Sequence, residues 1–322
     1  MFDKFGRNID YLRISVTDRC NLRCEYCMPE TGVEDIGHEN ILGFEDIERV
    51  VRAAVSLGFR KFRLTGGEPL VRRGIVSLVE RIAAVRGADA PVMTSNGLLL
   101  SRMAADLKAA GLRRVNISLD SLRAERYRRI TRGGVLADAL AGIRAAEAAG
   151  LFPIRLNVVT LRGFNDDEIS DFARLTLEHP WDVRFIELMP VGEGSAGFGL
   201  AYVSGREIET VLDGFVPVPA KAGVTEVAKY RKYPGAPGRV GFISPLSGHF
   251  CGDCNKLRLT ADGRLKTCLH SNREVDLRPA LRAKDETPLV ALLRAAVLSK
   301  EERHRINEGE APVRRGMSRI GG

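Results

Sequence analysis

Between residues 10 and 190 short apolar runs alternate with amphipathic stretches, and this alternation limits the possible folds more than any other feature. It is typical of repeated βα units around a parallel sheet. Six units are predicted, each beginning with a strand rich in Val, Ile and Leu. The strands are expected at 11–17, 61–65, 91–94, 114–119, 154–160 and 183–189.

Helices are expected between these strands because apolar residues recur there at three-and-four spacing, as Phe44, Ile47, Val51 and Val55 do. The predicted helices cover 44–57, 75–83, 101–110, 135–149 and 166–178. Gly58, Gly111 and Gly150 follow three of them, and glycine readily adopts the left-handed conformation that ends a helix.

Six βα units close less completely than eight, so the predicted fold is α/β, an incomplete (βα)6 TIM-like barrel. After Met189 the pattern gives way to a glycine-rich stretch, 190–199, expected to be a linker or mobile loop. The rest is expected to be a smaller α+β domain that covers the open side of the barrel, with helices at 206–212 and 289–298. We therefore divide the chain into residues 1–200 and 201–322.

Gly192, Gly194 and Gly197 spell the GxGxxG pattern. The dinucleotide-binding version must open a helix after a first strand, whereas the stretch 198–202 does not have a helical pattern. These residues are therefore predicted to be loop glycines.

All six cysteines fall into two triplets, Cys20-x3-Cys24-x2-Cys27 and Cys251-x2-Cys254-x13-Cys268. Three thiolates leave one iron of a four-iron cube open. The first spacing favours a cube, while the second suits a cube or a zinc ion with His270 as fourth ligand equally well. The polar start of the chain, without an apolar signal segment, argues against disulfides and favours a cytoplasmic location.

The first triplet directly follows the first predicted strand, and Gly66-Gly67-Glu68-Pro69 follows the second strand. Both segments are therefore expected at the C-terminal face of the barrel, where barrel enzymes carry out their reactions. Paired glycines let the backbone approach a ligand closely.

The chain carries 49 Lys and Arg against 41 Asp and Glu, a net charge of +8, which suggests an anionic partner. Its arginines are dispersed and only 6% of its residues are aromatic, so a nucleotide-sized anion is favoured over a nucleic-acid polymer. No run of about 18 apolar residues exists, so no membrane partner is expected.

The first triplet, Tyr26 within it and the Gly-Gly-Glu-Pro segment together resemble the radical S-adenosylmethionine (SAM) superfamily. The second triplet, the stretch 254–263 and the terminal Gly321-Gly322 are similar to the family of GTP 3′,8-cyclases, lyases of molybdenum cofactor biosynthesis. The resemblance runs nearly end to end. It implies two [4Fe–4S] clusters, SAM and GTP, and conversion of GTP to 3′,8-cyclo-7,8-dihydro-GTP by a 5′-deoxyadenosyl radical.

The resemblance also assigns roles to residues. Cys20, Cys24 and Cys27 would hold the cluster that binds SAM, and Cys251, Cys254 and Cys268 the cluster approached by guanine. The implied SAM contacts are Tyr26, Gly67, Ser118 and Met189, although Met189 also suits core packing. The implied substrate contacts are Arg13, Arg63, Thr94, Arg155, Lys256, Leu257 and Arg258, with Arg63 and Arg258 as catalytic residues.

Arg13, Arg63 and Arg184 lie inside predicted strands, where a buried charge needs a partner such as a triphosphate or a cofactor carboxylate. Two positions depart from the family pattern: Lys256 stands for the usual Arg, and Arg155 for the usual Lys. Charge is kept at both, while bidentate geometry is lost at the first and gained at the second.

Further implied partners are a flavodoxin- or ferredoxin-type electron donor or a reductase, a downstream cyclic pyranopterin monophosphate synthase, and a second copy of the chain in a homodimer. Gly321-Gly322 is either a frayed end or a slim tail that enters the active site. Two other classes stay open: a radical SAM peptide-modifying enzyme with an auxiliary cluster, and a zinc-stabilised RNA-binding protein without catalysis.

Overall fold

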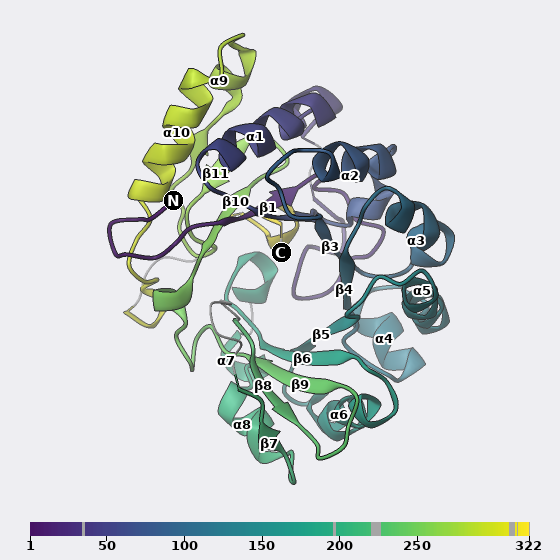
Figure 1. Ribbon diagram of the computed structural model, residues 1–322. Coiled ribbons are helices and arrows are strands. Elements are labelled where there is room, and N and C mark those ends of the chain that lie inside the picture. The colour runs from purple at the N-terminus through teal and green to yellow at the C-terminus, as the bar shows by residue number, and fades with distance from the viewer. Residues whose placement is uncertain (34–35, 196–197, 220–226, 309–312, 314, 322) are drawn as a thin grey trace.

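The computed structural model describes residues 1–33, 36–195, 198–219, 227–308, 313 and 315–321. One sheet of twelve strands, in the order β12-β11-β10-β1-β2-β3-β4-β5-β6-β9-β8-β7, curves into an open ring. The helices α1 to α6 stand outside this ring (Figure 1). The predicted incomplete barrel is thereby confirmed.

The middle of the sheet consists of six parallel strands. They are β1 (Tyr11–Ser15), β2 (Lys61–Thr65), β3 (Val92–Ser95), β4 (Arg114–Ser118), β5 (Arg155–Thr160) and β6 (Asp182–Glu187). The helices between them are α1 (Phe44–Ser56), α2 (Ile75–Ala83), α3 (Leu100–Ala109), α4 (Ala124–Ile130), α5 (Leu136–Ala148) and α6 (Ile169–Glu178). Gly58, Gly111 and Gly150 have positive φ after their helices, as predicted.

The two faces of each barrel strand have different surroundings because successive side chains point to opposite sides. In β1, Leu12 and Ile14 are fully buried in the core beneath the helices. Tyr11 and Arg13 alternate with them and are only half-buried. The ring interior is therefore lined with polar side chains, while the apolar core lies between sheet and helices.

The C-terminal part has no sheet of its own in the described residues, since its strands extend both edges of the barrel sheet. On one side β9 (Arg239–Ile243) pairs with β6, followed by β8 (Lys229–Lys232) and β7 (Val216–Pro217). On the other side β10 (Lys256–Leu259) pairs in parallel with β1, followed by β11 (Arg264–Lys266) and β12 (Val275–Asp276). The division at residue 200 stays a prediction.

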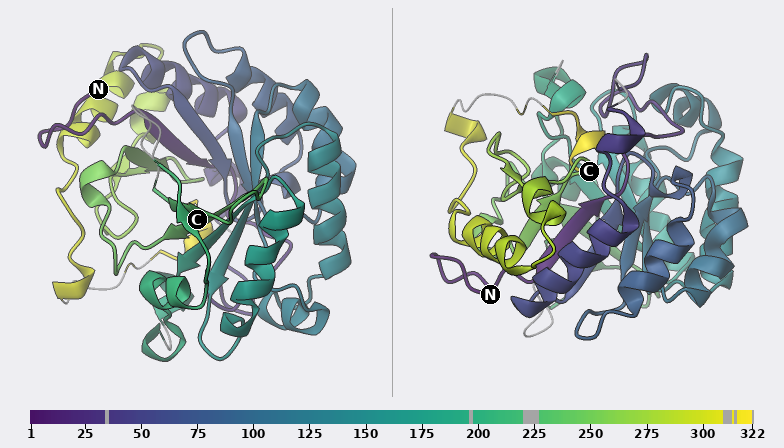
Figure 2. Two further views of the ribbon diagram at one scale, coloured as in Figure 1. Left: turned by 60° about the horizontal axis from the view of Figure 1, so that its bottom comes forward. Right: turned by 90° about the horizontal axis from the view of Figure 1, so that it is seen from above.

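The remaining helices are α7 (Phe198–Ala201), α8 (Gly205–Thr210), α9 (Arg278–Arg282) and α10 (Thr287–Leu298). Helix α10 packs on α1, and Arg49 of α1 donates to the carbonyl of Ala283 before α10 at 2.8 Å. Short 3-10 helices include η3 (Asp166–Glu168), η4 (Gly192–Ser195), η5 (Cys251–Asp253) and η7 (Met317–Arg319). In Figure 1 and in the left view of Figure 2, the yellow C-terminal segment reaches the middle of the ring.

Several sequence expectations need correction. The stretch after the glycine-rich segment forms one helical turn, α7, where no helix was expected, because Tyr202 closes the turn with a hydrogen bond to Phe198. Gly192 and Gly194 lie in η4, and Gly197 lies outside the described residues. The last strand of the barrel ends at Glu187, so Met189 follows it. Helices α4 and α9 were not predicted.

Candidate functional site

The first cysteine triplet lies in the loop after β1, at the C-terminal end of the barrel strands, as predicted. N–H groups already point at its sulfurs: Leu22 donates to Cys20 at 3.4 Å, and the backbone N–H of Ser318 donates to Cys27. Burial raises the pKa of Cys20 to about 11 and that of Cys27 to about 12, and it raises the pKa of Cys24 well above its usual value. Without a cation that replaces their protons, these thiols stay protonated at neutral pH.

The Gly-Gly-Glu-Pro segment packs against the loop of the first triplet. Gly67 donates to Thr17 at 2.8 Å, and a Cβ on Gly67 would lie 2.3 Å from the carbonyl oxygen of Arg19. The glycines therefore admit a neighbouring backbone, and the contact of Gly67 with SAM stays a prediction. Glu68 is 1% exposed and accepts from Leu70, Ser95 and Asn96 at 3.0, 2.9 and 2.7 Å.

Tyr26, a predicted SAM contact, is anchored by a residue that the sequence did not suggest. Its hydroxyl donates to Asp120 at 2.7 Å, and Asp120 also accepts from the backbone of Val159 at 2.8 Å. Ser118 ends β4 two residues before Asp120, which places it at the same end of the barrel. Met189 packs against an apolar cluster that contains Val313 and Ile320 of the C-terminal segment.

The second triplet lies at the opposite end of the barrel. Cys254 precedes β10, which runs parallel to β1 with Lys256 beside Tyr11. Cys268 follows β11, whose Lys266 lies beside Arg258, so it reaches the same end. At roughly 3.3 Å per residue, the four steps from Tyr11 to Ser15 place about 13 Å of strand between this level and the C-terminal end of β1.

Cationic groups surround the second triplet. Burial opposes ionisation of Cys254, but Lys300 and Lys256 outweigh it and lower its pKa. At Cys251 the side chain and the backbone N–H of His304 have the same effect. Burial prevails at Cys268 and raises its pKa. Two of these three thiols are thus predisposed to ionise.

Three arginines lie side by side on the inner wall between the two triplets. The register aligns Arg258 of β10 with Arg13 of β1, and Arg13 with Arg63 of β2. Burial and the neighbouring cations Arg258 and Arg63 lower the pKa of Arg13 well below its usual value. Three adjacent cations in a half-buried wall form a ready site for a polyanion.

Tyr11 and Lys256 lie below this wall, towards the second triplet. Burial opposes ionisation of Tyr11, but Arg63 and Arg13 lower its pKa to about 8. Burial lowers the pKa of Lys256 to about 8 as well. Leu257 differs from its neighbours: its side chain is fully buried in the core under the helices, and its contact with substrate stays a prediction.

The other predicted substrate contacts are held by protein partners. Arg63 donates to Thr94 at 3.0 Å and to the hydroxyl of Tyr11. Arg155 donates to Asp182 at 3.1 Å, and Asp182 also accepts two hydrogen bonds from Arg239. Arg184 bonds Asn157, and burial lowers its pKa to about 10. Arg155 and Arg239 therefore share the single negative charge of Asp182, and the three groups together keep one positive charge.

The C-terminal segment links the two ends of the site. After Ser318, which contacts Cys27, the chain reaches Gly321, whose carbonyl accepts from Arg258 at 2.7 Å and from Arg13 at 3.2 Å. Gly321 has φ +70°, and a Cβ there would lie 2.4 Å from Thr65 Oγ1. The tail therefore enters the barrel; Gly322 lies outside the described residues.

The donor sets fit iron–sulfur clusters. All six thiols are free, those of each triplet interact electrostatically with one another, and N–H groups face the sulfurs. Within the described part of the chain, no three His, Cys, Asp or Glu side chains converge on a single ion, and a cube does not require this because each thiolate binds its own iron. His270 is 5% exposed, its Nδ1 has no hydrogen-bond partner, and burial lowers its pKa to about 3, so it is neutral.

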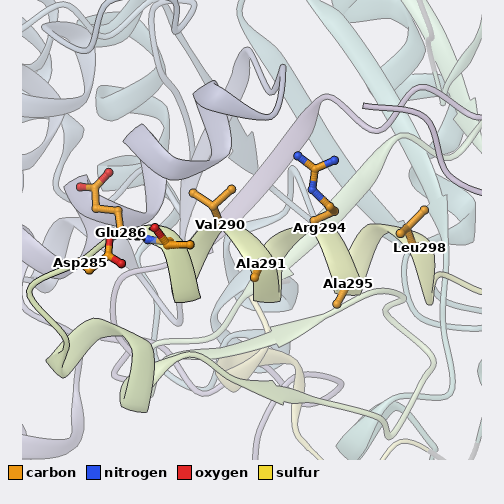
Figure 3. Close-up of a pocket in the computed structure, with 8 residues that line it drawn as sticks. Asp285, Glu286, Val290, Ala291, Arg294, Ala295 and Leu298 are labelled. Carbon is orange, nitrogen blue, oxygen red and sulfur yellow. Dashed lines mark hydrogen bonds between the residues drawn. The ribbon is translucent and has the colours of Figure 1, made fainter.

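A shallow depression on the outer side of α10 is separate from this site. Figure 3 shows its lining, which includes Asp285, Val290, Arg294 and Leu298. No predicted site residue belongs to it. None of the helices that the structure describes is long and apolar enough to cross a bilayer.

Sequence reasoning missed Glu68 as a site residue, together with Asp120, Lys300 and His304. Glu68 stands in a segment that was singled out, so its position was available. Asp120 directly follows a predicted strand, which is a usual place for functional polar side chains in barrels. Lys300 and His304 carry no spacing signal relative to the cysteines.

Comparison with known proteins agrees with this geometry. Residues 14–176 match the family model described as Radical SAM superfamily, and residues 181–306 match Molybdenum Cofactor Synthesis C. Among solved structures, Streptococcus suis SuiB bound to S-adenosylmethionine superposes with a TM-score of 0.65 at 15% identity. That match covers 89% of this chain and 65% of the SuiB chain, and it supports the fold alone.

Curated relatives match over all or nearly all of their length. Proteins named GTP 3′,8-cyclase from Pelotomaculum thermopropionicum and Alkaliphilus metalliredigens are 52% and 49% identical, each with 100% of both chains covered. The protein of that name from Geobacter sulfurreducens is 50% identical, over 100% of this chain and 99% of its own. On this evidence the chain belongs to the GTP 3′,8-cyclase family of the radical SAM superfamily.

Proposed function

We propose that this chain converts GTP to 3′,8-cyclo-7,8-dihydro-GTP in molybdenum cofactor biosynthesis. The observation that carries the proposal is the row Arg258, Arg13 and Arg63, which lies between two cysteine triplets at opposite ends of one barrel. A nucleoside triphosphate is a polyanion long enough to extend along such a wall. Hydrogen is removed from ribose C3′, and C3′ then joins C8 of the same guanine.

The cysteines divide the cofactors between the two ends. Cys20, Cys24 and Cys27 hold the first [4Fe–4S] cluster, and the proposed SAM contacts are Tyr26, Gly67, Ser118 and Met189. Cys251, Cys254 and Cys268 hold the second cluster, at which the guanine binds. The chemistry that the first cluster and SAM supply, when bound, is reductive cleavage of SAM to a 5′-deoxyadenosyl radical.

The protein's own residues bind and orient the nucleotide. Arg258 and Arg13 face the ring interior and neutralise phosphate charge, for which the guanidinium fork is well shaped. Arg63 is fixed by Thr94 and Tyr11 and therefore holds its contact to the nucleotide without reorganisation. The tail at Gly321 lies on Arg258 and Arg13, where it excludes water from the reacting part of the substrate.

The remaining partners follow from the same reaction. Each turnover needs two electrons from a reductase or a flavodoxin- or ferredoxin-type donor: one to cleave SAM and one, with a proton, to reduce the radical left after C3′ joins C8. The product passes to a cyclic pyranopterin monophosphate synthase. We also propose a homodimer and a cytoplasmic location.

The test is anaerobic incubation of the reconstituted protein with SAM, dithionite and GTP. We expect 5′-deoxyadenosine and the cyclised nucleotide in equal amounts, with iron and acid-labile sulfide for two four-iron cubes. Cys254→Ala is the matched control: it should still cleave SAM but lose cyclisation. Deoxyadenosine formed with a peptide and not with GTP, or two zinc ions without sulfide, would contradict the proposal.

A further inference from the structure

The segment from Lys300 to His304, directly after α10, lies against the second cysteine triplet. Lys300 is 2% exposed, and its Nζ donates to the carbonyls of Lys256 at 3.1 Å and Thr267 at 2.5 Å. Lys256 follows Cys254 by two residues, and Thr267 directly precedes Cys268. One ammonium group therefore ties together the two loops that carry these cysteines.

Besides bridging the two loops by hydrogen bonds, the ammonium group of Lys300 also interacts with the cysteine sulfurs. It donates to the Cys254 thiol and lies within electrostatic range of Cys268. A buried lysine with only neutral carbonyls as partners would be an expensive arrangement. Thiolates that share the negative charge of a cluster supply the missing counter-charge.

His304 completes this arrangement on the side of Cys251. It is 6% exposed, its Nε2 lies 3.0 Å from the carbonyl of Pro245, and its backbone N–H donates to the Cys251 sulfur. Its ring packs between those of His249 and His270, with centroids at 5.1 and 4.9 Å. The whole segment is thus placed by contacts on both sides.

Arg7 fixes the segment to the loop of Cys251. Its guanidinium donates to the carbonyls of Cys251, Glu301 and Glu302 at 2.9, 2.6 and 2.8 Å. A buried ion pair with Asp3 at 2.7 Å holds Arg7 itself. The distance between Lys300 and the cysteines is therefore set by a rigid framework.

The two triplets differ in whether a buried cation contacts one of their sulfurs. N–H groups face the sulfurs at both, but the second triplet has in addition a buried ammonium in contact with a thiol. Hydrogen bonds and positive charge next to cluster sulfurs stabilise the reduced, more negative state and raise the reduction potential.

We propose that Lys300 is the residue that sets the reduction potential of the second cluster, by placing a fixed positive charge at Cys254 and Cys268. The inference rests on the proposed function, because it requires that cluster. Lys300 contacts the cysteine loops and acts through the cluster ligands.

The test measures the potential of the second cluster alone. Cys20, Cys24 and Cys27 are replaced by Ala, the protein is reconstituted anaerobically, and reduction by dithionite is followed by electron paramagnetic resonance against solution potential. At the midpoint of this background protein, Lys300→Met should lower the ratio of reduced to oxidised cluster at least tenfold, equivalent to about 59 mV for one electron. Lys300→Arg, which keeps the charge, should change the ratio less than threefold.

Two further variants distinguish the effect of the lost positive charge from an effect of disturbed folding. Lys284→Met removes an exposed lysine near the start of α10 and should leave the ratio unchanged. Lys300→Gln keeps a donor for the two carbonyls without the charge, so it should shift the ratio in the same direction as Met even where Met disturbs the loops. An unchanged ratio in either variant that retains the cluster overturns the inference. A background protein without any iron overturns the second cluster itself, whatever Lys300 does.

Discussion

Glu68 is a buried carboxyl group whose protonation is shifted by its surroundings. Its carboxylate accepts three hydrogen bonds, all from neutral donors, and the side chain is 1% exposed. Burial outweighs these bonds and raises the pKa of Glu68 to about 7. Near neutral pH a substantial fraction of the molecules therefore carries a proton at the turn that packs on the first cysteine loop.

This shift predicts a dependence of stability on pH. The folded carboxyl binds its proton more tightly than the unfolded one, so this group makes the free energy of unfolding fall as pH rises from about 4.5 to about 7. The loss is on the order of 3 kcal/mol for a shift of this size. Urea unfolding of the cluster-free protein at pH 5 and pH 8 should show it, and Glu68→Gln should reduce it. Equal pH dependence in both proteins would count against a raised pKa.

At the scale of elements, local periodicity predicted the barrel half well and the C-terminal half poorly. Strand β2 and helix α2 were predicted at their observed bounds, because β2 alternates polar and apolar residues and α2 carries an apolar stripe. Helix α4 has only seven residues, three of them Arg, and shows no clear stripe. The pairing of β10 with β1 joins distant segments, and nothing in either segment encodes its partner. For the site, the spacing of the cysteines predicted the two triplets. The contacts of Asp120 and Lys300 join residues that are distant in the sequence, so the sequence alone does not predict them.

The packing of α5 on α3 gives an element-level prediction. A Cβ on Gly142 of α5 would lie 2.0 Å from the carbonyl oxygen of Gly97, just before α3. Gly142→Ala should therefore destabilise the protein by about 1–3 kcal/mol or more, since the helices must separate. Gly199→Ala in α7, where a Cβ meets nothing within 4 Å, should stay within about 0.5 kcal/mol. Urea unfolding measures both, and equal stabilities would refute the close approach.

At the scale of the whole molecule, the C-terminal tail, residues 315–321, connects the loop of the first triplet with the arginine wall. It contacts Cys27 through Ser318 and the arginine wall through Gly321. The wall and the first cluster loop are therefore connected by a few residues at the far end of the chain.

Gly321→Ala tests this connection. Its positive φ and the 2.4 Å approach to Thr65 leave no room for a Cβ, so the tail should be displaced. We expect at least a tenfold fall in cyclised nucleotide while iron and sulfide contents are unchanged. Gly214→Ala, equally strained at φ +76° but without neighbours within 4 Å, should cyclise GTP normally. Normal cyclisation by Gly321→Ala would remove the tail from the reaction.

The pairing of β10 with β1 and of β9 with β6 also determines how the chain must be made. While the ribosome is still synthesising residues beyond 200, β1 and β6 are unpaired edges of a parallel sheet, and such edges readily join other chains. Tyr11 pairs with Lys61 on one side, but its partner on the other side, Lys256, is available only after it has left the ribosome. The nascent barrel half is therefore the stage at which this chain is most exposed to association through its strand edges.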